Sequence, residues 1–66
     1  MTIIFNGQEQ TAPAGSSVLA LLETLGIAPG RVAVELNGAI VRRDTFARAI
    51  LSDGDRIEVV HFVGGG

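Results

Sequence analysis

Most of the apolar positions in this chain fall into short runs, separated by turn residues, that favour β-strands. Residues 2–6 are rich in β-branched and aromatic side chains, which favour a strand. Asn6-Gly7 comes next, and this pair predicts a tight hairpin because a type I′ turn needs positive φ at both central positions. A second strand at about residues 8–12 should therefore return antiparallel to the first.

One stretch has the spacing of a helix instead. Its apolar residues recur at i, i+3, i+4 and i+7 and predict a single buried stripe, formed by Val18, Leu21, Leu22 and Leu25. Ser16 or Ser17 can cap the start of this helix by accepting a backbone N–H. Gly26 stands where a left-handed residue commonly ends a helix, so the helix should run to about Leu25.

The second half of the chain returns to strand patterns. Residues 32–36 alternate apolar and polar or small side chains, which predicts a strand with one buried face. Asn37-Gly38 predicts a second tight hairpin that leads into a short strand at residues 39–41.

After this hairpin, residues 42–46 should leave the sheet as a short helical turn that places Phe46 inward. Ile50-Leu51 is apolar and is expected to form a brief strand, and residues 53–55 should form a turn. Residues 56–62 predict the last strand, which leads directly into three glycines.

The predicted order is two strands, one helix and two or three further strands. A single helix must bury its stripe against one face of a single mixed sheet. This predicts an α+β protein with the β-grasp (ubiquitin-like) fold, in which four to five strands pack on one main helix. We expect residues 1–63 to form this domain and residues 64–66 to form a flexible tail.

Strand alternation also predicts which residues face away from the helix. If Ile57 and Val59 point inward, the open face should carry an apolar patch beside the tail. The predicted partner-binding residues are Ile4, Glu58, Val60, Phe62 and Val63. The alternative is that these are isolated exposed apolar residues, which are ordinary on protein surfaces.

Gly64, Gly65 and Gly66 add no side chains to a core, and glycine is costly to order. Three extended residues span roughly 10 Å, so they can carry the carboxylate of Gly66 into the active site of another protein. The alternative is a frayed chain end, which is common in proteins.

The amino-acid composition excludes several classes of function. The chain has no cysteine, which excludes a disulfide framework, a thiolate metal site, an iron–sulfur centre and a cysteine nucleophile. The absence of cysteine also suits a cytoplasmic location. The net charge of −2 argues against a nucleic-acid partner. No apolar run has the length of a signal peptide or a membrane span, so no membrane association is expected.

No set of residues forms a recognisable active site or metal site. His61 lacks a motif that would supply a partner base or metal ligands, and residues 53–55 are too short to resemble a calcium loop. Gly15-Ser16-Ser17 fits a helix cap better than a phosphate site, because the lysine of a P-loop is missing. Arg42-Arg43 either steers an acidic surface or is simply solvated. If the protein takes part in chemistry, the reacting group should therefore be the carboxylate of Gly66.

The chain resembles the ThiS family of sulfur carrier proteins in thiamin biosynthesis. The resemblance covers nearly the whole chain, and its most specific part is the run from the Asp-Gly-Asp turn through the last strand to the three glycines. It implies that an E1-like adenylyltransferase (ThiF type) uses ATP to adenylate Gly66, while the carrier itself binds no cofactor. A cysteine desulfurase relay would then supply sulfur for a thiocarboxylate, and thiazole synthase (ThiG type) would take that sulfur.

Other interpretations share parts of this pattern. The small subunit of molybdopterin synthase has the same fold and tail, although its members are usually longer. Sulfur carriers for cysteine synthesis or tRNA thiolation are also possible. A different class is a β-grasp binding module that uses its sheet face and is never modified at Gly66. An enzyme in its own right is disfavoured, because no catalytic constellation is present.

Overall fold

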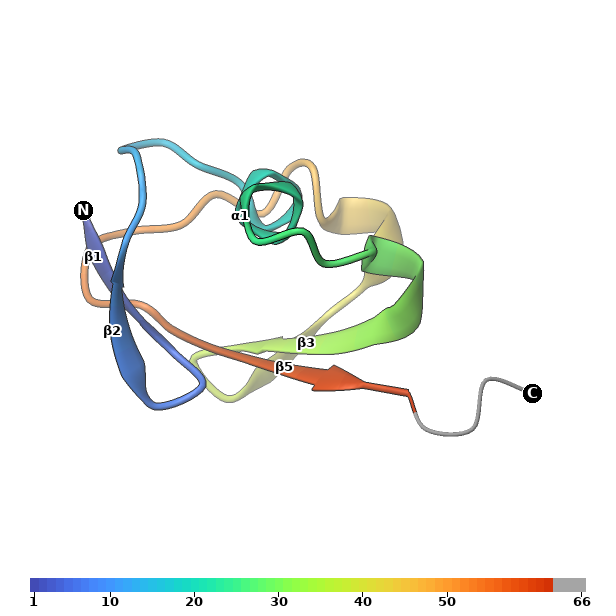
Figure 1. Ribbon diagram of the computed structural model, residues 1–66. Coiled ribbons are helices and arrows are strands. Elements are labelled where there is room, and N and C mark those ends of the chain that lie inside the picture. Colours follow the sequence, from blue (N-terminus) through green and yellow to red (C-terminus); the bar gives the residue numbers. More distant parts are fainter. Residues whose placement is uncertain (63–66) are drawn as a thin grey trace.

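The computed structural model describes residues 1–62 and contains eight short elements (Figure 1). In chain order they are β1 (Thr2–Phe5), β2 (Gln8–Thr11), α1 (Val18–Thr24), η1 (Pro29–Arg31), β3 (Val32–Leu36), β4 (Ala39–Val41), η2 (Arg43–Thr45) and β5 (Arg56–His61). The predicted elements are thus confirmed to within two residues at their ends, except for the brief strand at residues 50–51. The predicted tail at residues 64–66 lies outside the described residues.

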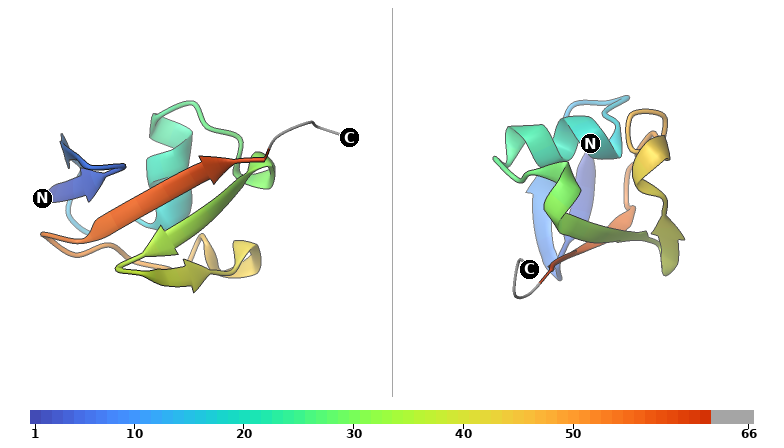
Figure 2. Two further views of the ribbon diagram at one scale, coloured as in Figure 1. Left: turned by 90° about the horizontal axis from the view of Figure 1, so that it is seen from below. Right: turned by 90° about the vertical axis from the view of Figure 1, so that its right-hand side faces the viewer.

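The five strands form one mixed sheet in the order β2-β1-β5-β3-β4. β5 lies in the centre, parallel to β1 and antiparallel to β3. The two hairpins, β1–β2 and β3–β4, form the flanks. Helix α1 crosses one face of this sheet and leaves the other face open (Figures 1 and 2). This is the β-grasp architecture that the order of elements predicts.

Both hairpins turn at the Asn-Gly pairs that the sequence singles out. Asn6 and Asn37 have φ values of 47° and 52°, and the glycines that follow have 83° and 85°. Asparagine tolerates this left-handed region better than most residues, and glycine enters it without steric cost. The turn type therefore follows directly from the local sequence.

Helix α1 begins and ends at defined signals. The Ser17 Oγ accepts a hydrogen bond of 3.0 Å from the Ala20 N–H, so Ser17 is the cap residue. At the other end, Gly26 has a φ of 72°. The Gly26 N–H bonds to the Glu23 carbonyl and the Ile27 N–H bonds to the Leu22 carbonyl, which is the Schellman pattern.

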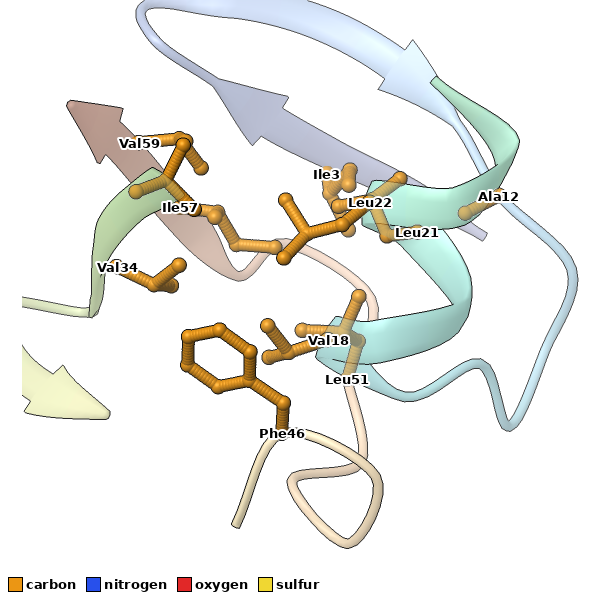
Figure 3. Packing of buried hydrophobic residues seen from close by; sticks show 11 residues of the cluster. Ile3, Ala12, Val18, Leu21, Leu22, Val34, Phe46, Leu51, Ile57 and Val59 are labelled. Carbon is orange, nitrogen blue, oxygen red and sulfur yellow. The ribbon is translucent and has the colours of Figure 1, made fainter. Parts of the chain in front are cut away.

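The core lies between α1 and the covered face of the sheet (Figure 3). Its buried residues come from α1, from β1, β3 and β5, and from three connecting segments, and are Ile3, Ala12, Val18, Leu21, Leu22, Val32, Val34, Phe46, Leu51, Ile57 and Val59. Leu25, the fourth residue of the predicted helical stripe, is only partly buried but still packs against this core. Phe46 is 3% exposed, which confirms that the segment after β4 turns it inward.

The predicted strand at Ile50-Leu51 does not form. Ile50 makes only an isolated bridge with Ser17, and its side chain is exposed, whereas Leu51 is buried. The Leu51 N–H donates to the Ser16 carbonyl, and the Val18 N–H donates to the Ala49 carbonyl. These backbone bonds attach the segment to the start of α1 instead of to a strand of the sheet.

Candidate functional site

The open face of the sheet follows from strand alternation in β5. Ile57 and Val59 are buried beneath α1, whereas Glu58, Val60 and Phe62 are exposed on the opposite side. Val60 is 60% exposed and Phe62 is 57% exposed, which is high for large apolar side chains. The structure therefore places three of the predicted partner-binding residues on the uncovered face, next to the point where the tail begins.

Ile4 belongs to this face but does not lie beside the tail. β1 and β5 pair with Ile4 opposite Arg56, four residues before Val60. At a rise of about 3.3 Å per residue, this separates Ile4 from Val60 by roughly 13 Å along the strand. Ile4 is also only partly exposed. The expected single patch of Ile4, Val60 and Phe62 is thus wrong, because the parallel register shifts Ile4 to the other end of β5.

The structure places two further apolar residues on this face: Ala33, which strand alternation also predicts there, and Ile40, which the sequence reasoning did not single out. Ala33 lies directly opposite Val60, and Ile40, which is 70% exposed, lies on β4 opposite Glu35. We call Ala33, Ile40, Val60 and Phe62 the open-face cluster. The strand has only three residues, Ala39–Val41, which is too few for side-chain alternation to show from the sequence that Ile40 faces away from the core.

The chain is held to the sheet as far as Phe62. The Phe62 N–H donates to the Arg31 carbonyl at 2.9 Å, which continues the pairing of β5 with β3 by one step beyond His61. The guanidinium of Arg43 lies 5.9 Å from the centre of the Phe62 ring, within cation–π range. The point from which the tail departs is therefore fixed. The predicted residues Val63, Gly64, Gly65 and Gly66 lie outside the described residues.

Two asparagine side chains hold the central strand from either side. Asn6 lies just past the end of β1, where its Nδ2 donates to the Val59 carbonyl and its Oδ1 accepts from the Val59 N–H at 2.8 Å. The Asn37 Oδ1 accepts from the Arg56 N–H at 2.9 Å. Each turn residue therefore also pairs with β5. The Asn-Gly signal predicted the turns but not these contacts with a strand far along the chain.

The charged groups of the open face are arranged across two strands. Glu35 and Glu58 lie directly opposite each other in the β3–β5 pairing, and both side chains point away from α1. Within residues 1–62, the one ion pair is between Arg42 and Asp44, at 3.1 Å and largely exposed. Neither glutamate therefore has a basic partner among the described residues.

In the described part of the chain, His61 and the acidic residues of the turn at 53–55, for which the sequence shows no catalytic or metal-binding motif, do not come together as a site. His61 is exposed and lies opposite Val32. The Asp53 carboxylate accepts from the Thr2 N–H, and that of Asp55 accepts from the Ser52 N–H and Asn37 Nδ2. Over residues 1–62, no three His, Cys, Asp or Glu side chains come together as a metal site would need. In the same range, no helix has the length and apolar character to cross a membrane.

Comparison with known proteins identifies a family that matches nearly the whole chain. The model of the ThiS family matches residues 3–66, which includes the last strand and all three glycines. The chain is 38% identical over its full length to the sulfur carrier protein ThiS of Escherichia coli, and the match covers all of that protein. The crystal structure of the thiamine biosynthesis protein (ThiS) from Geobacter metallireducens superimposes with a TM-score of 0.87 at 36% identity, covering 100% of both chains.

A longer relative also matches. The chain is 50% identical over all 66 residues to part of the thiazole synthase of Magnetococcus marinus, and it spans only 20% of the length of that protein. The β-grasp fold, the open face beside the last strand and the family match through Gly66 agree with one another. The chain belongs to the ThiS family.

Proposed function

We propose that this protein is a sulfur carrier of thiamin biosynthesis that works in the cytoplasm and carries sulfur as a thiocarboxylate on Gly66. The observation that carries the proposal is the family match, which continues through the last strand to Gly66 itself. The carrier of Escherichia coli, which matches over its whole length, supports the same role. In this proposal the domain supplies no catalytic group.

The chemistry at Gly66 needs partner enzymes, because a carboxylate is a poor acyl electrophile. An E1-like adenylyltransferase of the ThiF type would join the carboxylate to the α-phosphate of ATP and release pyrophosphate. The terminal sulfur of a persulfide from a cysteine desulfurase relay would then attack the acyl carbon and displace AMP. A thiol would cleave the resulting acyl disulfide, which leaves the thiocarboxylate on Gly66 and forms a disulfide between the thiol and the sulfur that carried the persulfide. Because this chain has no cysteine, any covalent link to a partner during transfer would run through the acyl group of Gly66.

In this proposal the role of the domain is to fix the point from which residues 63–66 begin. β5 is held on both sides by strands, Asn6 pairs with Val59, and the Phe62 N–H is bonded to Arg31. Residues 63–66 therefore start from a fixed point next to the open-face cluster. Ordering three residues in a partner channel costs roughly 3–6 kcal/mol of backbone entropy. Contacts of the partner with the exposed Val60 and Phe62 would offset part of this cost.

We propose thiazole synthase (ThiG type) as the acceptor of the sulfur. The Magnetococcus marinus relative bears the name thiazole synthase and contains a segment similar to this whole chain within one polypeptide. Segments joined in one protein commonly work on the same reaction path, so the present chain is expected to meet the same kind of enzyme. The thiocarboxylate would deliver its sulfur in the thiazole-forming step.

The proposal is tested by the intact mass of the protein purified from its own cells with the pathway induced. A species heavier by one sulfur-for-oxygen exchange, localised to the peptide that ends in Gly66, is the expected result. The same spectrum shows whether the working chain ends at Gly66. The reaction is then repeated with the adenylating enzyme, ATP and a sulfur source. An unchanged Gly66 in that reaction, with the enzyme active on another carrier, would refute the proposal.

A substitution in the tail tests whether the partner binds the tail in a channel that is too narrow for side chains. Replacing Gly65 by Val should leave the free energy of unfolding unchanged, because Gly65 lies six residues past Val59, the last buried core residue in the described part of the chain (residues 1–62). It should abolish adenylation, because a narrow channel that accepts glycine excludes a β-branched side chain. Pyrophosphate release measures the first step and urea denaturation measures the fold. Normal thiocarboxylate formation by Gly65→Val would show that the adenylating enzyme does not bind the tail in a narrow channel.

A further inference from the structure

We propose that Glu35 and Glu58 together receive one arginine side chain of thiazole synthase, and that this contact sets the register in which the enzyme docks on the open face. The inference rests on the proposed function, since it assumes that thiazole synthase is the acceptor. It adds a specific recognition element to the apolar cluster. The two glutamates lie in the middle of the face, on the paired strands β3 and β5, and β5 is the strand that leads to the tail.

The first argument is the arrangement of the two carboxylates. Residues directly opposite in an antiparallel pair have Cβ atoms about 4.5–5.5 Å apart, and like charges in this position destabilise a sheet. Glu35 and Glu58 occupy such a position on the same face. Arg56 lies two residues before Glu58 on that face, yet neither glutamate forms an ion pair within residues 1–62. The free protein therefore holds two neighbouring negative charges that its own arginines do not pair.

The second argument is what surrounds the pair. Ile40 lies next to Glu35 on β4, and Val60 lies two residues beyond Glu58 on β5. Both apolar side chains are largely exposed, at 70% and 60%. A partner that covers them would exclude water around the carboxylates as well, and a charge-assisted contact is stronger in such a setting. The pair thus lies inside the surface that a partner must cover, and not at its rim.

The third argument is the direction of the tail. From Glu58, β5 runs through Val60 to Phe62, where the chain is bonded to Arg31, and residues 63–66 follow. The left view of Figure 2 looks onto the open side of the sheet and shows β5 running through the sheet between β1 and β3. A partner fixed at the glutamate pair would therefore have the start of the tail a short distance along the same strand. This is the geometry needed to align an active site with Gly66.

Arginine fits this site better than lysine. Its planar guanidinium presents five N–H donors in a fixed fork and can bond to two carboxylates at once, whereas the lysine ammonium is a compact and strongly hydrated charge. Arginine is also enriched among the residues that dominate the binding energy of interfaces. The complementary surface should therefore be apolar with one arginine at its centre.

The test measures the dissociation constant between this protein and the thiazole synthase of the same organism by titration calorimetry. Glu35→Gln and Glu58→Gln remove one charge each while keeping the size of the side chain. Each should weaken binding by about thirtyfold or more, as expected when one partner of a largely desolvated charge pair is lost. Glu23→Gln is the matched control, since Glu23 is exposed on α1 on the other side of the sheet. It should bind as the unmodified protein does.

The double variant decides whether the two glutamates act on one group. If they share one arginine, the double variant should lose less than the product of the two single losses. Unchanged binding of Glu35→Gln and Glu58→Gln, or fully independent losses, would overturn the proposal. The melting temperature of the variants should not fall, because each substitution removes a repulsion, so a loss of binding would not reflect unfolding.

Two further measurements separate this inference from the proposed function. If the unmodified protein forms the thiocarboxylate but does not bind thiazole synthase, both the acceptor assignment and this inference fail. If it binds while the glutamine variants bind equally well, only this inference fails. Thiocarboxylate formation by the adenylating enzyme should be the same for all variants. An equal loss in that step would assign the glutamate pair to the adenylating enzyme and overturn the present assignment.

Discussion

At the scale of single residues, Asn6 shows how one side chain serves two structural roles. It takes the positive φ that the hairpin needs, and its amide pairs with both backbone groups of Val59. β1 ends at Phe5, so without this amide the backbone of Val59 would face no strand on that side. The side chain therefore extends the sheet by one step, close to where the tail leaves.

Replacing Asn6 by Asp should lower the free energy of unfolding by about 1 kcal/mol or more. Aspartate tolerates positive φ and keeps the acceptor for the Val59 N–H, but it places an oxygen against the Val59 carbonyl in place of the Nδ2 donor. Urea denaturation measures the change. Gln8→Glu is the control, since it adds the same charge to an exposed neighbouring position. Equal stabilities of the two variants would argue against this role for the amide.

At the scale of elements, α1 depends on its surroundings because it is only seven residues long. Isolated helices of this length are not stable in water. Its stability comes from burial of Val18, Leu21 and Leu22 together with the Ser17 cap and the Gly26 end. The sequence predicted this helix well because the stripe and both end signals are local.

Ser17→Ala should destabilise the protein by about 1 kcal/mol, because the Ala20 N–H loses its cap. Ser16→Ala is the matched comparison one residue earlier. The Ser16 hydroxyl donates to the Pro13 carbonyl outside the helix, and the loss of this exposed bond should cost about 0.5 kcal/mol or less. Thermal unfolding followed by circular dichroism compares the two. A larger loss for Ser16→Ala would show that Ser17 is not the cap residue that matters.

At the scale of the whole molecule, 66 residues support a single small core, and domains of this size have little stability to spare. Within residues 1–62, eleven buried apolar residues form the core between α1 and the sheet. Each large one should therefore account for a considerable share of the total stability.

Leu22→Ala should cost about 2–5 kcal/mol, since the side chain is fully buried and its removal leaves a cavity. This loss is large enough to unfold a considerable fraction of the protein at moderate temperature. Leu19→Ala is the comparison on the same helix, where the side chain is only partly buried. Chemical denaturation of both variants measures the difference, and equal losses would contradict the packing described here.

Removing Gly65 and Gly66 should leave the free energy of unfolding within about 0.5 kcal/mol of the full chain. Among residues 1–62 the last buried core residue is Val59, and the two removed glycines have no side chains to add to a core. The shortened protein should no longer be adenylated, as pyrophosphate release would show. A β-grasp binding module that uses only its sheet face would keep its partner and its activity after this truncation.

Local sequence alone determined most of the elements of this protein. The Asn-Gly turns, the helical stripe with its ends, the strand alternation and the three glycines are each read from a few adjacent residues. Backbone sterics and side-chain periodicity decide these features, and both act over short distances.

Only the tertiary structure decided how distant segments pair. The register of β1 with β5 moved Ile4 away from the tail, and the pairing of β3 with β5 brought Glu35 opposite Glu58. The bonds of residues 49 and 51 to the start of α1 replaced the expected strand at Ile50-Leu51. These outcomes depend on how the whole core packs, because the register between strands far apart in the chain is set by burial of one common face.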